Sequence, residues 1–348
     1  MRFLVVGACH PDIDYLRFGM KIVLSFDYEL FFGTDPGSVY KCMLEPTDRL
    51  LDLAERFQIP MVFFVDAGFL VKLDDYRTTF PELEKDAQAI HDQLKRMISL
   101  GCAVELHVHP HWEKSSYQNG KWKIQTNSCY KLSDFSKEEA ASIMRRYSDT
   151  LTRWTGQKQK AFRAGGWCVQ PFDHIGEVLA DLGIKVDSSV FPGGRFESPH
   201  YDFDFTAVAP FSRSYTFTSN VSKEEEAGTF TEVPISSWRF SPLFYWRLYI
   251  SGRLNKSRHR MWGDGNFLAQ PGRKKSVLTN FTWNHVSCDG FYAGMLVKQA
   301  GFYRSLDHVP FVVIGHPKGL SVYALEKLEE FIRLTYKIDE FTTFQPWS

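Results

Sequence analysis

Three histidines at alternate positions in one short stretch are the strongest sign of chemistry in this chain. His107, His109 and His111 occur in "ELHVHPHW", directly after an apolar run. Side chains two residues apart in an extended strand point to the same side, so the three imidazoles can face one space. Neutral imidazoles suit Zn²⁺, Co²⁺ or Ni²⁺, and three protein ligands leave a place for water. A lone buried histidine is more often a core residue, but three on one side predict a divalent metal site, with Zn²⁺ as the first choice.

Two acidic side chains offer the remaining ligand. Asp27 and Glu29 lie in "SFDYEL", at the end of another apolar run. Their spacing also places them on one side of an extended chain. Two carboxylates beside apolar residues are costly to bury unless a cation joins them. We therefore expect an acidic side chain and the imidazoles to hold one cation together.

Three further polar groups follow apolar runs. Arg163, in "FRAGGW", can hold a carboxylate ionised, and the two glycines after it let backbone approach a ligand closely. Asp187, in "VDSSVFPGG", can orient Arg163 or a histidine, or can simply form a turn. His316, in "VVIGHPKG", is a candidate general acid, because the pKa of histidine is easily held near neutral.

The elements that must position these groups alternate along the chain from residue 20. Short apolar runs predict strands at 21–26, 61–65, 103–108, 160–164, 184–189, 230–235, 277–283 and 311–315. Amphipathic stretches predict helices at 46–57, 84–100, 136–155, 172–182 and 322–337, the third opening with a capping box from Ser136 to Glu139. Apolar strands bounded by helices indicate an α/β fold with a parallel sheet covered on both faces, and this number of strands favours a closed or nearly closed β/α barrel. In such a barrel, functional groups gather at the carboxyl ends of the strands.

Two segments break the alternation. Residues 1–19 have no clear period and are treated as an N-terminal extension of unclear role, so that 20–348 form a single barrel. Residues 196–275 predict long loops inserted in the barrel. This insertion carries basic residues that either face solvent or contact an anion or a membrane surface: Arg247, Arg253, Lys256, Arg258, Arg260, Arg273, Lys274 and Lys275.

Composition excludes several classes of protein. With 44% apolar and 24% charged residues in a chain of 348, a globular core is expected. Lys+Arg and Asp+Glu balance at 41 each, which argues against a nucleic-acid partner. The six cysteines form no CxxC pair, so reduced thiols are expected. No apolar run is long enough for a transmembrane helix and no convincing secretory signal is present, so we expect a cytoplasmic location.

Five segments, taken in chain order, resemble the motifs of the polysaccharide deacetylase family, carbohydrate esterase family four. The segments are "SFDYE", "HVHPH", "FRAGGW", "DSSVFPGG" and "IGHPK", and the resemblance covers roughly residues 20–195 and 311–319. It implies a distorted, TIM-like (β/α) barrel of seven or eight strands that holds a divalent metal. It also implies a hydrolase that removes an acetyl group from an N-acetylated sugar.

The resemblance assigns roles to residues of this chain. Asp27 would be the general base, His107 and His111 metal ligands, Arg163 the partner of the base and His316 the general acid. Asp187 joins them as a catalytic candidate. We expect substrate contacts from Tyr28, Trp112, Gly166 and Trp167.

The first motif departs from the family pattern. The family usually has two adjacent aspartates, whereas here Tyr28 takes the second place and Glu29 follows. Either Glu29 binds the metal with its longer side chain, or Asp27 becomes the ligand and the base is lost. His109 occupies a non-ligand position of the family and is a third imidazole ligand or a substrate contact.

Alternatives from other classes stay open. Some members of the superfamily hydrolyse non-sugar amides or ureides, and some of these work without metal. A carbohydrate-binding barrel whose catalysis has lapsed is a further reading. If the location is cytoplasmic, a sugar precursor linked to a nucleotide or a lipid phosphate is the expected substrate, with peripheral membrane contact as an option and the oligomeric state open.

Overall fold

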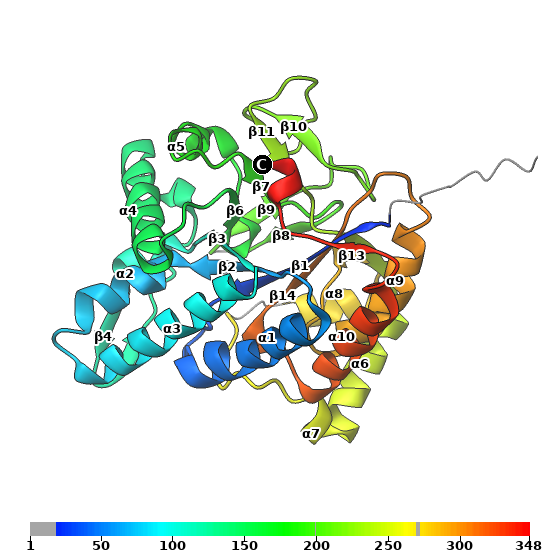
Figure 1. Ribbon diagram of the computed structural model, residues 1–348, viewed down its shortest axis with the longest axis horizontal. Coiled ribbons are helices and arrows are strands. Elements are labelled where there is room, and N and C mark those ends of the chain that lie inside the picture. The colour runs from blue at the N-terminus through cyan, green and yellow to red at the C-terminus, as the bar shows by residue number, and fades with distance from the viewer. Residues whose placement is uncertain (1–18, 199, 269–271) are drawn as a thin grey trace, which may run out of the picture.

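The computed structural model describes residues 19–198, 200–268 and 272–348. The predicted N-terminal extension therefore lies outside the described residues except for Gly19. A sheet runs through the middle of the molecule, and helices surround it (Figure 1). The fold is mixed α/β, as the sequence predicts.

Seven parallel strands form the main part of the sheet. Their order is β11-β7-β6-β3-β2-β1-β14, with β10 antiparallel outside β11 and β15 beside the start of β1. The strands are β1 (Lys21–Tyr28), β2 (Val62–Asp66), β3 (Ala103–Val108), β6 (Ala161–Ala164), β7 (Val186–Asp187), β10 (Tyr215–Phe217), β11 (Phe230–Glu232), β14 (Phe311–Gly315) and β15 (Glu340–Phe341). Nearly every residue of β1, β2, β3 and β14 is buried, which is the pattern of a parallel sheet covered on both faces.

Irregular backbone curls the sheet toward a closed barrel. Ile235 donates its backbone N–H to Val190, and Ser236 donates its own to Val312 of β14. Farther along the same edge of β14, Ile314 donates its backbone N–H to Val286, and Ser287 forms a parallel bridge with Ile314. The distorted (β/α) barrel is thus completed by short extended segments, around Ile235 and around Val286, that form a few hydrogen bonds and no full strand.

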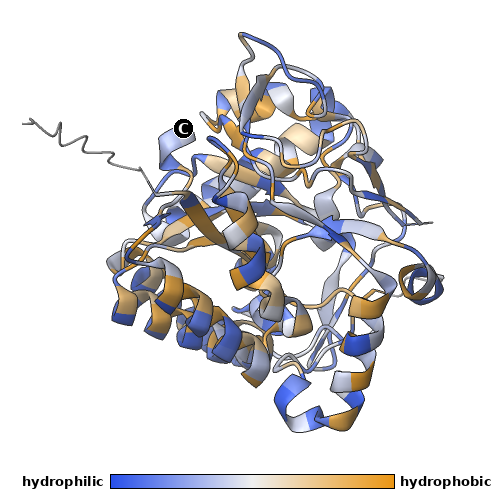
Figure 2. Ribbon diagram, turned by 90° about the vertical axis from the view of Figure 1, so that its right-hand side faces the viewer, coloured by the Kyte–Doolittle hydropathy of each residue, from blue (hydrophilic) through white to orange (hydrophobic). Residues whose placement is uncertain are grey.

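Helices cover the outside of the sheet. They are α1 (Glu45–Phe57), α2 (Ala67–Tyr76), α3 (Pro81–Ser99), α4 (Lys137–Thr155), α5 (Gly176–Asp181), α9 (Leu296–Tyr303) and α10 (Val322–Thr335). Apolar and polar residues alternate around their turns, as the colours in Figure 2 show. The capping box of α4 is confirmed: the Ser136 hydroxyl accepts from the Glu139 N–H, and the Glu139 carboxylate accepts from the Ser136 N–H. Helix α2 was not predicted, because it follows β2 without an intervening turn signal.

The insertion differs from the prediction of long loops. It contains α6 (Pro242–Leu254), α7 (Lys256–His259) and α8 (Arg273–Thr279), with strands β8 (Arg195–Glu197), β9 (Asp202–Asp204) and β12 (Ser237–Phe240). The strand predicted at 277–283 is misplaced. The observed strand β13 is Thr282–His285, and residues 277–279 of the predicted strand form the end of α8. The Ser241 hydroxyl caps α6, and aromatic residues pack the inner face of this helix, which the prediction of loops over 196–275 does not include. A further hairpin, β4 (Ser116–Gln118) and β5 (Lys121–Lys123), lies outside the insertion.

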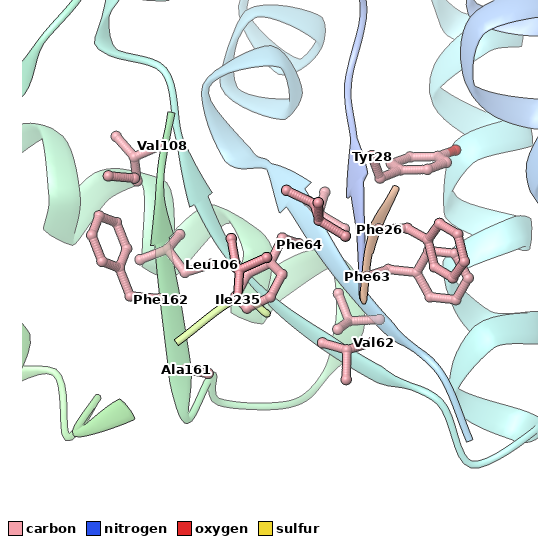
Figure 3. Close-up of a cluster of buried hydrophobic side chains, with 14 of the residues drawn as sticks. Phe26, Tyr28, Val62, Phe63, Phe64, Leu106, Val108, Ala161, Phe162 and Ile235 are labelled. Carbon is pink, nitrogen blue, oxygen red and sulfur yellow. The ribbon is translucent and has the colours of Figure 1, made fainter. Parts of the chain in front are cut away.

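The core fixes which side of each strand faces the barrel interior. Figure 3 shows Phe26, Tyr28 and Phe63 gathered on the side of the neighbouring helices. Because side chains alternate along β1, Asp27 and Glu29 point the other way. The five cysteines in the described part of the chain are free and buried. Among the helices that the structure describes, none is long and apolar enough to cross a membrane.

Candidate metal and catalytic site

A cavity of about 550 Å³ opens at the carboxyl ends of the barrel strands. Asp27 and Glu29 from β1 reach it, as do His107 and His109 from the end of β3 and His316 after β14. Its other walls come from the insertion and from the segment after β13. The fold therefore brings together groups that are nearly 290 residues apart in the chain, as Lys318 and Glu29 are.

Arg163 on β6 holds Asp27 in place. The guanidinium is fully buried and donates from Nη1 to Asp27 Oδ1 at 2.7 Å. Its other donors reach Ser188 O at 2.8 Å and Ser25 Oγ at 2.9 Å. Burial alone would raise the pKa of Asp27, but Arg163, His107 and His316 outweigh it, so this pKa is lowered. The predicted partnership of Arg163 with this carboxylate is present, and it leaves Asp27 ionised with Oδ2 facing the cavity groups.

Glu29 meets two imidazoles with one oxygen. Its Oε2 lies 3.1 Å from His107 Nε2 and 2.7 Å from His109 Nε2. Lys318 donates to the other oxygen, Oε1, at 2.8 Å. Within the described residues, Glu29, His107 and His109 form the group whose ligand atoms all lie within 4.8 Å of one another.

The chemistry of this group fits a divalent cation. His107 Nδ1 bonds to Arg163 O at 2.8 Å, which fixes the ring with Nε2 toward Glu29. Burial lowers the pKa of His109 to about 4 and outweighs the opposite effect of Glu29, so the ring is neutral at pH 7 and able to bind metal. Neither His109 nitrogen has a hydrogen-bond partner in the described structure, although the ring is buried. His109 Nε2 therefore lies close to Glu29 Oε2 but is not aligned for a hydrogen bond with it. A metal ion bound by both atoms would explain this arrangement.

Gly165 makes room for the His109 ring. A Cβ at this position would lie 2.5 Å from both Cε1 and Nδ1 of His109. Gly165 begins the turn Gly165–Trp167 directly after β6. Gly165, the first glycine of "FRAGGW", thus makes room for the imidazole cluster. Gly166, the second, lines the cavity, and the close approach of its backbone to a ligand stays a prediction.

His111 lies beside this group rather than in it. Strand β3 ends at Val108, and Pro110 starts a short 3-10 turn, Pro110–Lys114, so the period of two does not continue to His111. Its fully buried ring packs against Phe32, Trp112 and Tyr130. The structure therefore brings His109, and not His111, to Glu29 and His107, while the ligand role of His111 stays a prediction.

His316 is held by an acidic partner. Asp289 Oδ2 bonds to His316 Nδ1 at 2.7 Å, and Asp289 Oδ1 accepts from the His316 backbone N–H at 2.8 Å. Burial lowers the pKa of His316, but Asp289 and the site carboxylates outweigh it, so the pKa is raised. His316 Nε2 lies 3.6 Å from Asp27 Oδ2, so the imidazolium faces the space next to the predicted base.

Of the two alternatives predicted for Asp187, the structure shows the local turn contacts. The Asp187 carboxylate accepts from the backbone N–H and the hydroxyl of Ser189, at 3.0 and 2.8 Å. Burial raises the pKa of Asp187 and of its neighbour Glu232. Arg163 is oriented instead by Ser188, the next residue in the chain.

Two of the four expected substrate contacts point away from the cavity. Tyr28 is fully buried on the outer side of β1, where its hydroxyl donates to Gln93 of α3 at 2.8 Å. Trp112 is fully buried and donates from Nε1 to Asp66 Oδ2 at 2.6 Å. The sequence prediction is corrected for both: they pack the core. Gly166 and Trp167 do line the cavity.

Sequence reasoning missed three site residues. Lys318 lies in a quoted motif but has no predicted role, and Asp66 carries no prediction. Asp289 lies in a polar segment that the sequence offers as a substrate contact or a loop, and its contact with His316 is not predicted. Asp66 ends β2 in register with His107. Burial, with Glu29 nearby, raises its pKa to about 7. A carboxylate at the end of an apolar strand was the available signal for Asp66.

The arrangement predicts which side chains bind metal. In the protein stripped with a chelator, Zn²⁺ or Co²⁺ affinity measured by calorimetry should fall by about a hundredfold or more for Glu29→Gln and His109→Ala, because each removes a ligand. His111→Ala, a matched change on the same segment, should leave affinity within about threefold of the parent. Loss of affinity in His111→Ala but not in His109→Ala would instead support the ligand set implied by the family resemblance.

Comparisons with known proteins agree on the fold. No family model and no curated protein sequence matches this chain. Among solved structures, a putative polysaccharide deacetylase from Mycobacterium smegmatis is 15% identical, with a TM-score of 0.53 over 98% of this chain and 92% of its own. The 4-alpha-glucanotransferase from Thermococcus litoralis is 13% identical, with a TM-score of 0.52 over 95% of this chain and 40% of its own. A family 4 carbohydrate esterase from Streptomyces lividans, solved with acetate, is 15% identical over 49% of this chain and 62% of its own, with a TM-score of 0.30.

The likenesses to the Mycobacterium smegmatis and Thermococcus litoralis structures, with TM-scores of 0.53 and 0.52, establish the architecture. The glucanotransferase carries out a different reaction, as its name says, so the barrel alone does not decide the reaction. The decision rests on the side chains at the strand ends. The chain has the distorted (β/α) barrel fold that it shares with the putative polysaccharide deacetylase.

Proposed function

We propose that this protein is a metal-dependent hydrolase that removes the acetyl group from an N-acetylated sugar. One observation carries the proposal: Asp27, held by Arg163, lies 3.6 Å from His316 and 3.9 Å from His107, beside the Glu29–His109 pair. A base, an acid and a metal donor set thus meet in one cavity. The fold shared with a putative polysaccharide deacetylase supports the same reaction class.

Glu29, His107 and His109 are the residues that would hold the metal. The donor set of two nitrogens and one carboxylate oxygen suits Zn²⁺, with Co²⁺ or Ni²⁺ as alternatives. When bound, a divalent cation lowers the pKa of a water molecule and polarises the acetyl carbonyl.

Asp27 acts as the general base. Its Oδ1 is engaged by Arg163, so Oδ2 is the oxygen that accepts the proton of the attacking water. Arg163 keeps this carboxylate ionised before the reaction, since the pKa of Asp27 is lowered despite its burial.

His316 acts as the general acid. Asp289 orients Nδ1, which leaves Nε2 directed toward Asp27 and the cavity. As the tetrahedral intermediate collapses, the C–N bond breaks and Nε2 donates a proton to the departing amine. Acetate and a free amino sugar leave the site.

Aromatic walls give the cavity its affinity for a sugar ring. Trp167, Tyr130, Tyr201 and Phe32 line it, and an aromatic face suits the apolar side of a pyranose. Gly166 lies next to Trp167 with a positive φ of 60°, and a Cβ there would lie 2.7 Å from the Tyr130 ring. A glycine at position 166 therefore leaves room for the Tyr130 ring next to Trp167.

A phosphate-linked precursor is the substrate form that we propose. Arg273 lines the catalytic cavity and also a neighbouring cavity of about 360 Å³, so it stands where a group attached to the sugar would extend. Two other basic residues of the insertion, Arg258 and Arg260, are less suitable for a phosphate contact. Arg258 bonds to Glu326, and neither residue lines the cavity.

A second candidate function is favoured by Lys318. Its ammonium lies 2.8 Å from Glu29 Oε1 and also donates to Leu30 O, so the protein itself supplies a cation to this carboxylate. Such a site can keep Glu29 ionised without metal, as a metal-free hydrolase of non-sugar amides or ureides would need. Full activity on a ureide in chelated protein, with no acetate released from an acetylated amino sugar, would select this candidate.

The roles proposed for Asp27 and His316 predict a loss of turnover without a loss of bound metal. Asp27→Asn and His316→Ala should each lower kcat by about a hundredfold or more, because each removes a proton-transfer group. Metal content measured by elemental analysis should stay near that of the parent. Tyr28→Phe is a matched control on the same strand but on its outer side, and should retain full kcat. Retention of turnover by Asp27→Asn would remove the proposed base.

The Asp289–His316 contact predicts a pH effect. Because Asp289 helps to raise the pKa of His316, the acid-competent imidazolium persists to higher pH and activity is lost as pH rises through this raised pKa. Asp289→Asn should therefore move the alkaline limb of the kcat/KM profile to lower pH. An unmoved alkaline limb would mean that His316 is not the titrating acid.

The substrate proposal predicts discrimination by Arg273. Arg273→Gln should lower kcat/KM by about tenfold for a nucleotide-linked N-acetylated sugar, because it removes a charge-assisted contact to phosphate. The free sugar should be hydrolysed as by the parent. Arg260→Gln, a charge-matched control outside the cavity lining, should change neither value. Equal losses on both substrates in Arg273→Gln would reject a phosphate contact.

A further inference from the structure

Helix α6 carries an apolar stripe on its outer face. Leu243, Trp246, Ile250 and Leu254 are exposed by 58, 51, 50 and 82%. Their spacing of three, four and four residues places them on one side of a helix. The opposite side packs Phe244 and Tyr245 into a small core with Phe240 and Val277. The helix is thus anchored by one face and presents large apolar side chains with the other, and in Figure 1 it lies with α7 at the lower margin of the molecule.

The surroundings of the stripe are basic. Residues 237–283 contain nine lysines and arginines against a single acidic residue, Asp264, which bonds to Ser38. Helix α8 lies beside α6, since Trp246 Nε1 donates to Leu278 O and Lys274 lies over the Tyr249 ring. Arg258 pairs with Glu326, whereas Arg247, Arg253, Lys256, Arg260 and Lys275 form no ion pair within the described part of the chain.

The inner side of α6 belongs to the catalytic cavity. Leu248 and Gly252 of this helix line it, together with apolar residues after α7 such as Met261 and Phe267. Phe267 is 59% exposed, so this wall of the cavity continues to the surface. One helix therefore separates the candidate site from the apolar stripe.

We propose that the outer face of α6 and its flanking basic residues dock the protein on an anionic lipid surface. The name docking face is used for Leu243, Trp246, Ile250 and Leu254 with Arg247, Arg253 and Lys256. Apolar side chains enter the headgroup boundary while the arginines and lysine meet lipid phosphates. A helix of this length, about 20 Å, lies in the interface and does not span it.

Charge decides between a lipid surface and a second copy of the chain. Pairing of two docking faces would bring like charges together, whereas an anionic surface complements them. Docked in this way, α6 would hold the cavity next to the lipid headgroups. The docking proposal does not depend on the reaction at the site, and its test does not use catalysis.

The test is cosedimentation of the full chain with vesicles. Vesicles of phosphatidylcholine containing about one third phosphatidylserine should bind the protein at least about tenfold more tightly than pure phosphatidylcholine, and added salt should weaken this binding. Ile250→Gln with Leu254→Gln, and separately Arg247→Gln with Arg253→Gln, should each weaken it by about tenfold.

Matched controls lie elsewhere on the surface. Leu334→Gln with Ile338→Gln removes side chains that are 54 and 58% exposed, and Lys121→Gln with Lys123→Gln removes two exposed charges. Neither pair should change binding, and thermal unfolding should show that all variants are folded. Absence of binding to anionic vesicles, or equal losses in the controls, would overturn the proposal. So would a dimer in sedimentation velocity that dissociates in the α6 variants.

Discussion

The buried guanidinium of Arg163 is the interaction on which the site depends. It bonds to Ser25 and Asp27 of β1 and to Ser188 after β7, and it lies over the Phe64 ring of β2 at 4.1 Å. The backbone carbonyl of Arg163 accepts a hydrogen bond from the His107 ring on β3. Arg163, a single residue of β6, therefore contacts four other strands or strand ends of the barrel. Removing either member of a buried ion pair leaves an unpaired charge, at a cost of about 3–5 kcal/mol, so Arg163 and Asp27 hold each other and the strand ends in place.

A division of labour between two neighbouring carboxylates follows from this constraint. Asp27 is engaged by Arg163 and faces His316, which suits a proton acceptor. Glu29 is engaged by Lys318 at one oxygen and faces two imidazoles with the other, which suits a metal ligand. The tyrosine between them faces the opposite side of the strand, so the acid-x-acid spacing, and not the usual adjacent pair, places both carboxylates in the cavity.

The sequence predicted the barrel because its strands are nearly continuous apolar runs and several helix ends carry recognisable signals, such as the capping box of α4. It also predicted the strand ends at which Asp27, Glu29, His107 and His316 lie. The choice between His109 and His111 could not be made from spacing, because Pro110 turns the backbone between them. Two contacts could not be predicted: that of Arg163 with Ser188 and that of Asp289 with His316. Both join segments that are distant in the chain, and such packing leaves no local pattern in the sequence. The helices of the insertion were missed because aromatic residues surround α6 without a clear polar face.

The most direct measurement is a crystal structure of the zinc-loaded protein with anomalous diffraction recorded on both sides of the zinc absorption edge. Our account predicts one anomalous peak about 2.0–2.2 Å from Glu29 Oε2, His107 Nε2 and His109 Nε2, with Asp27 still bonded to Arg163. A peak held by Asp27 or by His111 in place of these atoms, or no peak in the cavity of a protein soaked with zinc, would contradict it.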